Sequence, residues 1–284
     1  MNPNIKLIIF NGPPFSGKDT GVDAIFELPQ LQGTDNGVRA RFKNVLYENT
    51  AQRYNLDLED WVRICNDGAV KDQPQDYLEG KSPRQVLIYE SEEVIKKEHG
   101  ETGVAVITAN RLKDKIKDMV NPIIAFSDGG FNCEIKPLME ILGITRDQVL
   151  IFRCHADGCS FDNDSREWLV DYDHDVYNDK TILYHNTIRK LTDRFLADEY
   201  FIYHFNLLPE DPLRLCREFD QTQEMVVVAK SPERAWQIFK EHYRSDVTDK
   251  TFDAKMTYQI TEVGMVTNNS VERNKVLIHE TRPS

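Results

Sequence analysis

The chain has 284 residues, of which 40% are hydrophobic and 29% are charged, and it carries a formal net charge of −12. These proportions are typical of a folded protein and exclude a disordered one. The acidic charge disfavours extended contact with a nucleic-acid backbone, which requires clustered Lys and Arg. We therefore expect no polynucleotide partner.

No apolar run approaches the length that spans a membrane, and the first residues lack the pattern of a signal peptide. A cytoplasmic protein without a membrane partner is expected. The five cysteines are odd in number and scattered, which argues against a disulfide framework. Cys154, His155 and Cys159 could contribute to a zinc site, but no second ligand pair accompanies them, so a packing role is favoured.

A strand, a loop and a helix are predicted in succession near the amino terminus. Residues 5–10 form a nearly continuous apolar run, as in a buried parallel strand. Residues 18–28 carry apolar side chains at helical spacing, and Pro29 would end that helix. This order is the context that a phosphate-binding loop requires.

The loop between strand and helix has the pattern G-x-x-x-x-G-K, formed by Gly12, Ser16, Gly17 and Lys18 with their neighbours. Glycines let backbone N–H groups point at phosphate oxygens, and the following helix presents its positive end. Lys18 would reach the β- and γ-phosphates of a nucleoside triphosphate and offset charge during phosphoryl transfer. The alternative is a chance glycine turn that opens a helix.

The two residues after Lys18 depart from the usual form of this loop. Asp19 stands where a Ser or Thr ligand for magnesium is common, and Thr20 follows one position later. Asp19 could lie near the metal, or it could simply favour the helix start through the helix dipole. A Gly-Lys-Asp-Thr ending resembles small-molecule kinases, including nucleoside monophosphate kinases, more than regulatory GTPases.

The next predicted elements are helices. Val38, Phe42, Val45 and Leu46 fall on one helical face, which predicts a helix that carries Arg41 and Lys43, with Arg39 on or beside it. Ser82, Pro83 and Gln85 predict another helix start with a capping box, and Gly100 would end that helix.

Further strands alternate with helices up to about residue 200. Helical spacing is found over residues 104–116 and 181–196, and apolar runs that predict strands occupy 122–128 and 148–153. The alternation predicts an α/β fold with a parallel sheet flanked by helices. Ligands bind at the carboxyl edge of such a sheet, where Gly12, Asp128 and Arg153 would meet.

The pattern changes after residue 200. Strands are predicted at 224–229, 256–266 and 275–280, with a helix at 234–243. We therefore predict a P-loop kinase-like domain over residues 1–205 and a small α+β domain of unassigned role over residues 206–284. No catalytic constellation is recognised in the second domain.

The order of motifs over the first ~200 residues resembles the bacteriophage deoxynucleoside monophosphate kinase family. The motifs are the phosphate loop, Arg41 to Leu46, Ser82 to Glu93, and Ser127-Asp128 followed by Phe131 and Glu134. Arg153, a short lid containing Arg166 and the turn Asn178 to Thr181 continue the same order. The sequence departs from the family at Gly129 and Gly130, where relatives commonly have an arginine.

Candidate roles follow from residue chemistry and from this resemblance. Asp128 could bind magnesium or orient the acceptor phosphate, or it could be a strand-end cap. Arg41, Lys43 and Arg84 could hold an acceptor monophosphate, and Arg153 and Arg166 could close over the transferring group. Solvated helix surface is the competing interpretation for Arg41, Lys43 and Arg84, and a lone surface arginine is the competing interpretation for Arg153 and Arg166.

We predict an ATP- and Mg²⁺-dependent kinase that phosphorylates a small nucleotide, namely a deoxynucleoside monophosphate, with Lys18 and arginines stabilising charge. If a phage encodes it, it would act in the host cytoplasm, and a homodimer is compatible with the sequence. Alternatives are a kinase for another small molecule, and a binding protein whose degenerate site senses nucleotide. A polynucleotide kinase is disfavoured by the acidic charge.

Overall fold

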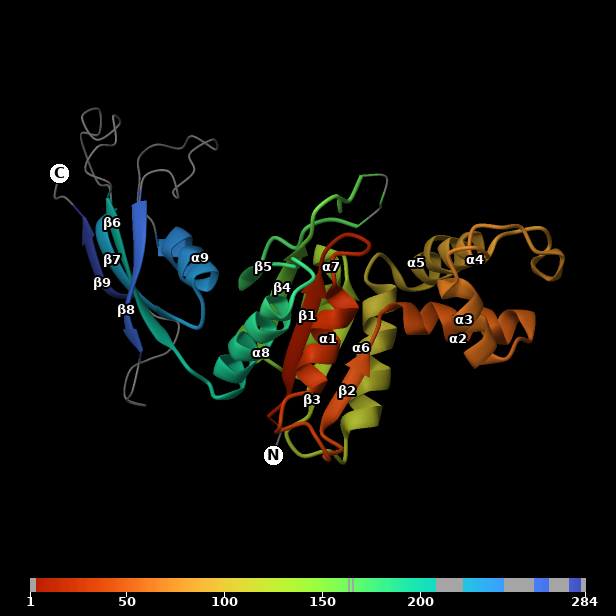
Figure 1. Ribbon diagram of the computed structural model, residues 1–284, viewed down its shortest axis with the longest axis horizontal. Coiled ribbons are helices and arrows are strands. Elements are labelled where there is room, and N and C mark those ends of the chain that lie inside the picture. Colours follow the sequence, from red (N-terminus) through yellow and green to blue (C-terminus); the bar gives the residue numbers. More distant parts are fainter. Residues whose placement is uncertain are drawn as a thin grey trace. The chain divides into compact units, whose positions relative to one another are not determined.

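The computed structural model describes residues 4–162, 164, 166–207, 222–242, 258–265 and 276–281. The chain divides into two compact units (Figure 1). The first unit comprises Met1–Val170 and Val176–Ile188, and the second comprises Asp171–Asp175 and Arg189–Ser284.

A five-stranded sheet of order β2-β3-β1-β4-β5 occupies the centre of the first unit (Figure 1). The pairs β1–β3, β1–β4 and β2–β3 are parallel. The fold is therefore α/β, as the alternating pattern predicted. The strands are β1 (Lys6–Asn11), β2 (Gly37–Ala40), β3 (Ile123–Gly129), β4 (Val149–His155) and β5 (His174–Tyr177).

The central strands form the core because both of their faces are covered. All six residues of β1 are buried, and the Phe10 ring stacks on Phe152 of β4 with centroids 5.1 Å apart. Helix α1 packs on β1 and β3, and α6 packs on α7. The helices nearest the sheet are α1 (Lys18–Phe26), α6 (Gly103–Ile116), α7 (Asn132–Leu142) and α8 (Ile182–Leu196).

A group of helices inserted between β2 and α6 has an apolar centre of its own, built around the fully buried Trp61. The Trp61 indole N–H donates to the Thr50 hydroxyl at 2.7 Å, which satisfies its only donor. The predicted capping box of Ser82 and Gln85 is confirmed. The group comprises α2 (Lys43–Tyr54), α3 (Leu58–Asn66), η1 (Asp76–Leu78), α4 (Pro83–Tyr89), the π-helical η2 (Glu90–Ile95) and α5 (Lys96–His99).

The prediction of a helix through Val38 was wrong for its first half. Val38 and Arg39 lie in β2, which pairs in parallel with β3, and α2 begins only at Lys43. The apolar residues showed helical spacing there because Val38, a buried residue of β2, lies only a few positions before the buried residues of α2. As a result Arg41 lies between strand and helix, and Lys43 is the first helical residue.

A short 3-10 turn, η3 (Arg146–Gln148), leads into β4. The second unit contains a four-stranded antiparallel sheet of order β8-β6-β7-β9. Trp236 and Phe239 of its helix pack on Phe205 of the sheet. The elements are β6 (Phe201–Leu207), β7 (Thr222–Ala229), α9 (Pro232–His242), β8 (Tyr258–Met265) and β9 (Val276–Thr281).

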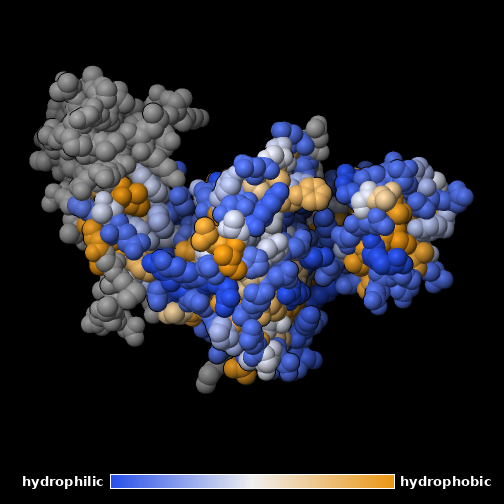
Figure 2. Space-filling model, in the orientation of Figure 1, coloured by the Kyte–Doolittle hydropathy of each residue, from blue (hydrophilic) through white to orange (hydrophobic). Residues whose placement is uncertain are grey.

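Hydrophilic residues predominate on the face drawn in Figure 2, in keeping with the net charge of −12. Apolar side chains that reach the surface include Phe15 in the glycine-containing loop, which is 89% exposed. Across the part of the chain that is described, no helix has both the length and the apolar character needed to cross a bilayer.

Candidate functional site

The loop of residues 12–17 joins β1 to α1 and depends on its glycines. Gly17 has a φ of 96°, and a Cβ there would lie 2.2 Å from Nδ2 of Asn178. A Cβ on Gly12 would lie 2.5 Å from the Cys154 carbonyl oxygen. Both positions therefore require glycine for space, and Gly17 also requires it for backbone conformation.

Lys18 and Ser16 supply the polar groups of this loop. The buried Lys18 ammonium donates to the Pro13 carbonyl at 2.6 Å. Desolvation, with a smaller contribution from the nearby Arg166 charge, lowers the pKa of Lys18 to about 8. The Ser16 hydroxyl is fully buried and has no hydrogen-bond partner within the described structure, which is a costly arrangement unless another group binds there.

Asn178 and Tyr184, which are distant from the loop in sequence, donate hydrogen bonds to its backbone carbonyls. Asn178 Nδ2 donates to the Ser16 carbonyl at 3.3 Å, and the Tyr184 hydroxyl donates to the Gly17 carbonyl at 3.0 Å. These bonds occupy carbonyl groups of the loop with protein donors. The Ser16 N–H also donates within the loop, to the Pro13 carbonyl at 3.3 Å, so the unpartnered Ser16 hydroxyl, the Lys18 ammonium and the other backbone N–H groups are the donors available to an anion.

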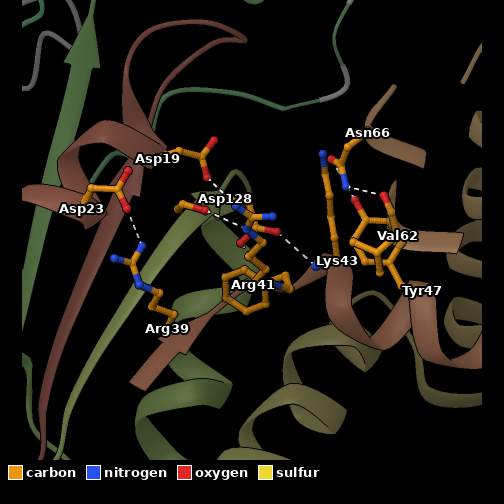
Figure 3. Close-up of polar contacts among 11 residues, drawn as sticks. Asp19, Asp23, Arg39, Arg41, Lys43, Tyr47, Val62, Asn66 and Asp128 are labelled. Atoms are coloured by element: carbon orange, nitrogen blue, oxygen red, sulfur yellow. Dashed lines mark hydrogen bonds and ion pairs between the residues drawn. The ribbon is translucent and has the colours of Figure 1, made fainter. Parts of the chain in front are cut away.

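Asp128 ends the predicted strand β3 and connects it to α2. Its two carboxylate oxygens accept the backbone N–H groups of Phe42 and Lys43, each at 3.0 Å (Figure 3). Burial raises the pKa of Asp128, and these two N–H donors act in the opposite direction. Asp128 therefore caps α2 from a distant strand, and it also lies among the cations described next.

Arg41 and Asp19 link the loop to the edge of the sheet. One Arg41 nitrogen donates to Asp19 at 2.7 Å, and its Nε donates to the Ser127 hydroxyl at 3.2 Å (Figure 3). This places Asp19, directly after Lys18, within reach of β3. No hydrogen bond of the half-buried Thr20 hydroxyl is found within the described part of the chain.

Lys43 extends from the first turn of α2 toward the same charges. Its side chain reaches solvent, yet the protein atoms around it lower the pKa of its ammonium by desolvation. The Asp128 carboxylate opposes this shift, whereas the Arg166 and Arg41 charges reinforce it. The described residues offer no hydrogen-bond acceptor to this ammonium, so it can bind an anion without breaking an internal bond.

Arg166 joins this cluster from the segment between β4 and β5. Its Nε and backbone N–H both donate to Asp164, at 2.9 and 3.0 Å, and the second carboxylate oxygen accepts from Nη2. The charges of Asp128 and Glu134 also lie close enough to raise the pKa of Arg166 after the Asp164 contribution. Arg166 thus brings a cation to the edge that carries Lys18 and Asp128.

Arg153 and Arg84 occupy different surroundings. Arg153 was predicted to close its strand but lies two residues before the end of β4, and its Nε and Nη2 donate to the Leu169 carbonyl at 2.8 and 2.5 Å. Arg84 lies in α4, half-exposed, and pairs with Asp72 at 3.0 Å. Among the described contacts, none joins Arg84 to Asp128 or to Lys43.

Three residues of the same edge were given no role from the sequence, although Glu134 was part of the motif that follows Asp128. Glu134 is buried beside Asp128, and desolvation raises its pKa to about 8. Asn11, fully buried at the end of β1, donates to the Gly129 and Glu167 carbonyls and accepts from Leu169 N. Asp164 pairs with Arg166. A polar residue that closes an apolar strand directly before a glycine loop was the available signal for Asn11.

Cys154, His155 and Cys159 are not brought together as a group of three ligands. Within the described residues, no three His, Cys, Asp or Glu side chains are grouped so as to hold a metal ion. Cys154 is buried under the loop, where burial raises the pKa of its thiol to about 12, and the Tyr184 hydroxyl lies 3.4 Å from its sulfur. His155 instead stacks on Trp168 with ring centroids 4.4 Å apart.

Comparison with known proteins assigns the chain to no family. No protein-family model matches the chain, and no curated protein matches it. One solved structure that it matches is described as that of "a putative kinase" from Chloroflexus aurantiacus, at 16% identity and a TM-score of 0.28. That match covers 55% of this chain and 62% of the other chain, which is less than two thirds of the other chain's length.

Proposed function

We propose that the chain is an ATP-dependent kinase that transfers a phosphoryl group to a deoxynucleoside monophosphate. The observation that carries this proposal is the collection of cations at one edge of the sheet. Lys18 lies in a glycine loop at a helix start, and Arg41, Lys43 and Arg166 surround Asp128 beside it. A site with cations on two sides of a phosphate loop suits a reaction between two anions.

Each side chain has a task in this proposal. The loop N–H groups and Lys18 bind the β- and γ-phosphates, and the buried Ser16 hydroxyl donates to a phosphate oxygen. Lys43 and Arg41 bind the acceptor phosphate, and Arg166 neutralises charge on the group in transfer. Asp128 orients α2, and therefore Lys43, because its carboxylate holds the first two N–H groups of that helix. Arg153 fixes the segment that carries Arg166 rather than touching substrate.

Magnesium fits the oxygens present at this edge. The Thr20 hydroxyl has no internal partner among the described residues, and Asp19 and Asp128 provide carboxylates on either side of Arg41. Mg²⁺ usually takes one or two such oxygens and completes its shell with water and phosphate. Thr20 and Asp128 would hold it, Asp128 through water because its oxygens already accept two N–H groups. The ion would supply charge neutralisation between the β- and γ-phosphates.

The proposal is tested by assaying transfer from ATP to each of the four deoxynucleoside monophosphates. Lys18→Ala should lower kcat by roughly 100-fold or more, because it removes the mobile cation of the loop. Lys43→Ala should mainly raise KM for the monophosphate. Undiminished transfer by Lys18→Ala would refute this mechanism. Lys113→Ala, on the far end of α6, serves as the control.

Two other functions are distinguished by the same assay. A kinase for another small molecule shares the loop and would transfer to a non-nucleotide acceptor from a substrate panel. A nucleotide-binding protein would bind ATP and transfer to no acceptor. The open Lys43 ammonium favours transfer to an anionic acceptor, because a pure ATP sensor has no need for a second anion site.

A further inference from the structure

Gly130 lies directly beneath the side chain of Arg166. A Cβ at Gly130 would be 2.6 Å from Cδ and 2.7 Å from Cγ of Arg166, closer than nonbonded carbons approach. Gly130 is not among the glycines with positive φ, so its backbone would accept alanine. Glycine is needed at position 130 because the Arg166 side chain occupies the space of a Cβ there.

Hydrogen bonds hold the backbone that follows Arg166, over residues 167–170, to Gly130, to Asn11 of β1 and to Asn132 of α7. Glu167 N donates to the Gly130 carbonyl at 3.1 Å, and Asn11 bonds the Glu167 carbonyl and Leu169 N at 2.9 and 3.1 Å. Asn132 Oδ1 accepts Val170 N at 2.8 Å. A segment tied in this way to β1 and to the start of α7 holds the preceding residue, Arg166, in one place.

The guanidinium is oriented as well as located. Asp164 accepts from the Nε, Nη2 and backbone N of Arg166, and Asp164 itself is only partly exposed. With two of its nitrogens engaged on one edge, the guanidinium keeps its other edge for a ligand. The Arg166 charge lies within electrostatic range of Lys18, Lys43, Asp128 and Glu134.

We propose that Gly130 and Asp164 are positioning residues that preset Arg166 at the phosphate site, Gly130 by leaving the space and Asp164 by fixing the guanidinium. Arg166 then acts as a fixed cation rather than as part of a lid that swings in. This inference rests on the proposed function, because it assigns Arg166 to the phosphoryl group in transfer. Preset charge costs no reorganisation during reaction, which is its catalytic advantage.

A double-mutant cycle tests the inference. The variants are Gly130→Ala, Arg166→Ala, the combination of both, and Gly68→Ala as the control, since Gly68 has no atom within 4 Å of an added Cβ. We expect Gly130→Ala to lower kcat about 10-fold or more with little change in KM for ATP, and Arg166→Ala to lower it about 100-fold. In the Arg166→Ala background, Gly130→Ala should change kcat less than about twofold, because residues that act as a unit are non-additive.

The structural part is checked without an activity assay. The Nε–H resonance of Arg166, measured by NMR, should lose its hydrogen-bonded shift in Gly130→Ala and in Asp164→Asn, and stay unchanged in Gly68→Ala. Equal effects of Gly130→Ala in both backgrounds, or an unshifted resonance, would overturn the inference. If the wild-type chain transfers phosphate to no acceptor, the proposed function fails instead. The inference is then decided by the Nε–H resonance of Arg166 alone, and an unshifted resonance in Gly130→Ala counts against it.

Discussion

The Asp128 carboxylate accepts the backbone N–H of Lys43 at 3.0 Å, and the same carboxylate attracts the Lys43 ammonium. One side chain at the end of β3 therefore sets both where α2 begins and where its first cation lies. Helix α2 has no capping side chain of its own, since its N-cap residue is Phe42. Loss of Asp128 should consequently affect stability and the site together.

Asp128→Ala should lower the free energy of unfolding by roughly 1–2 kcal/mol, the usual value of a helix N-cap, and should also reduce phosphoryl transfer. Asp57→Ala is the matched control, because Asp57 caps α3 by accepting Asp60 N at 2.9 Å but lies outside the cluster. Urea denaturation and the transfer assay measure the two effects. Comparable destabilisation of both variants with full activity only in Asp57→Ala is expected. Full activity of Asp128→Ala would contradict the assignment.

ATP binding should weaken as the pH rises through about 8, because the pKa of Lys18 is lowered to about 8 and only the charged ammonium attracts phosphate. Bound phosphate favours the charged form, so the transition in the complex should lie at higher pH than in the free protein. Calorimetric titration with ATP between pH 6.5 and 10 at constant ionic strength measures this. Lys18→Arg keeps its charge over the range and should remove the transition. A pH-independent wild-type affinity would refute the prediction.

Gly17→Ala should abolish ATP binding and destabilise the fold, because an alanine there combines a φ of 96° with a Cβ 2.2 Å from Asn178. Gly33→Ala isolates the backbone contribution, since Gly33 has a φ of 70° and an added Cβ meets nothing within 4 Å. We expect Gly33→Ala to cost about 1 kcal/mol of stability and to leave ATP binding intact. Equal losses of stability in the two variants would show that the contact with Asn178 does not matter.

Arg53→Ala should destabilise the helical group strongly, because it leaves the buried Glu90 carboxylate without its cation. Arg53 donates to Glu90 at 2.6 Å, and the Glu90 side chain is 2% exposed. Removal of one partner from a buried pair costs about 3–5 kcal/mol, and the cost is lower here because the Arg53 side chain is 42% exposed and Asn49 still donates to Glu90 at 3.0 Å. Arg63→Ala breaks an exposed pair with Asp60 and should change stability by less than about 1 kcal/mol. Thermal and urea denaturation compare the two.

Local sequence patterns predicted the elements whose stability is mostly local or uniformly buried. The continuous apolar runs at β1, β3 and β4 have both faces covered, so no alternation was needed to recognise them. The Ser82 capping box is closed by residues three positions apart and could be read directly. Helix α3 was missed because its polar residues resemble a loop, and because Trp61 is buried by apolar residues from other helices, among them Tyr47, Leu78 and Val86.

The residues of the candidate site also divide into those that the sequence predicted and those that only tertiary contacts bring together. The amino-acid sequence by itself predicted the glycine loop, because the spacing of Gly12, Gly17 and Lys18 is a local pattern. It also placed Asp128 and Arg153 near the carboxyl ends of their strands, because parallel strands share one carboxyl edge. Only the tertiary structure decided which cations meet there. Arg166 lies against Gly130 and within electrostatic range of Lys18, and Asn11 donates to the carbonyl of the adjacent Glu167, whereas Arg153 donates to the Leu169 carbonyl. Which cations lie together depends on packing between segments that are far apart in the sequence, and no local sequence pattern encodes that packing.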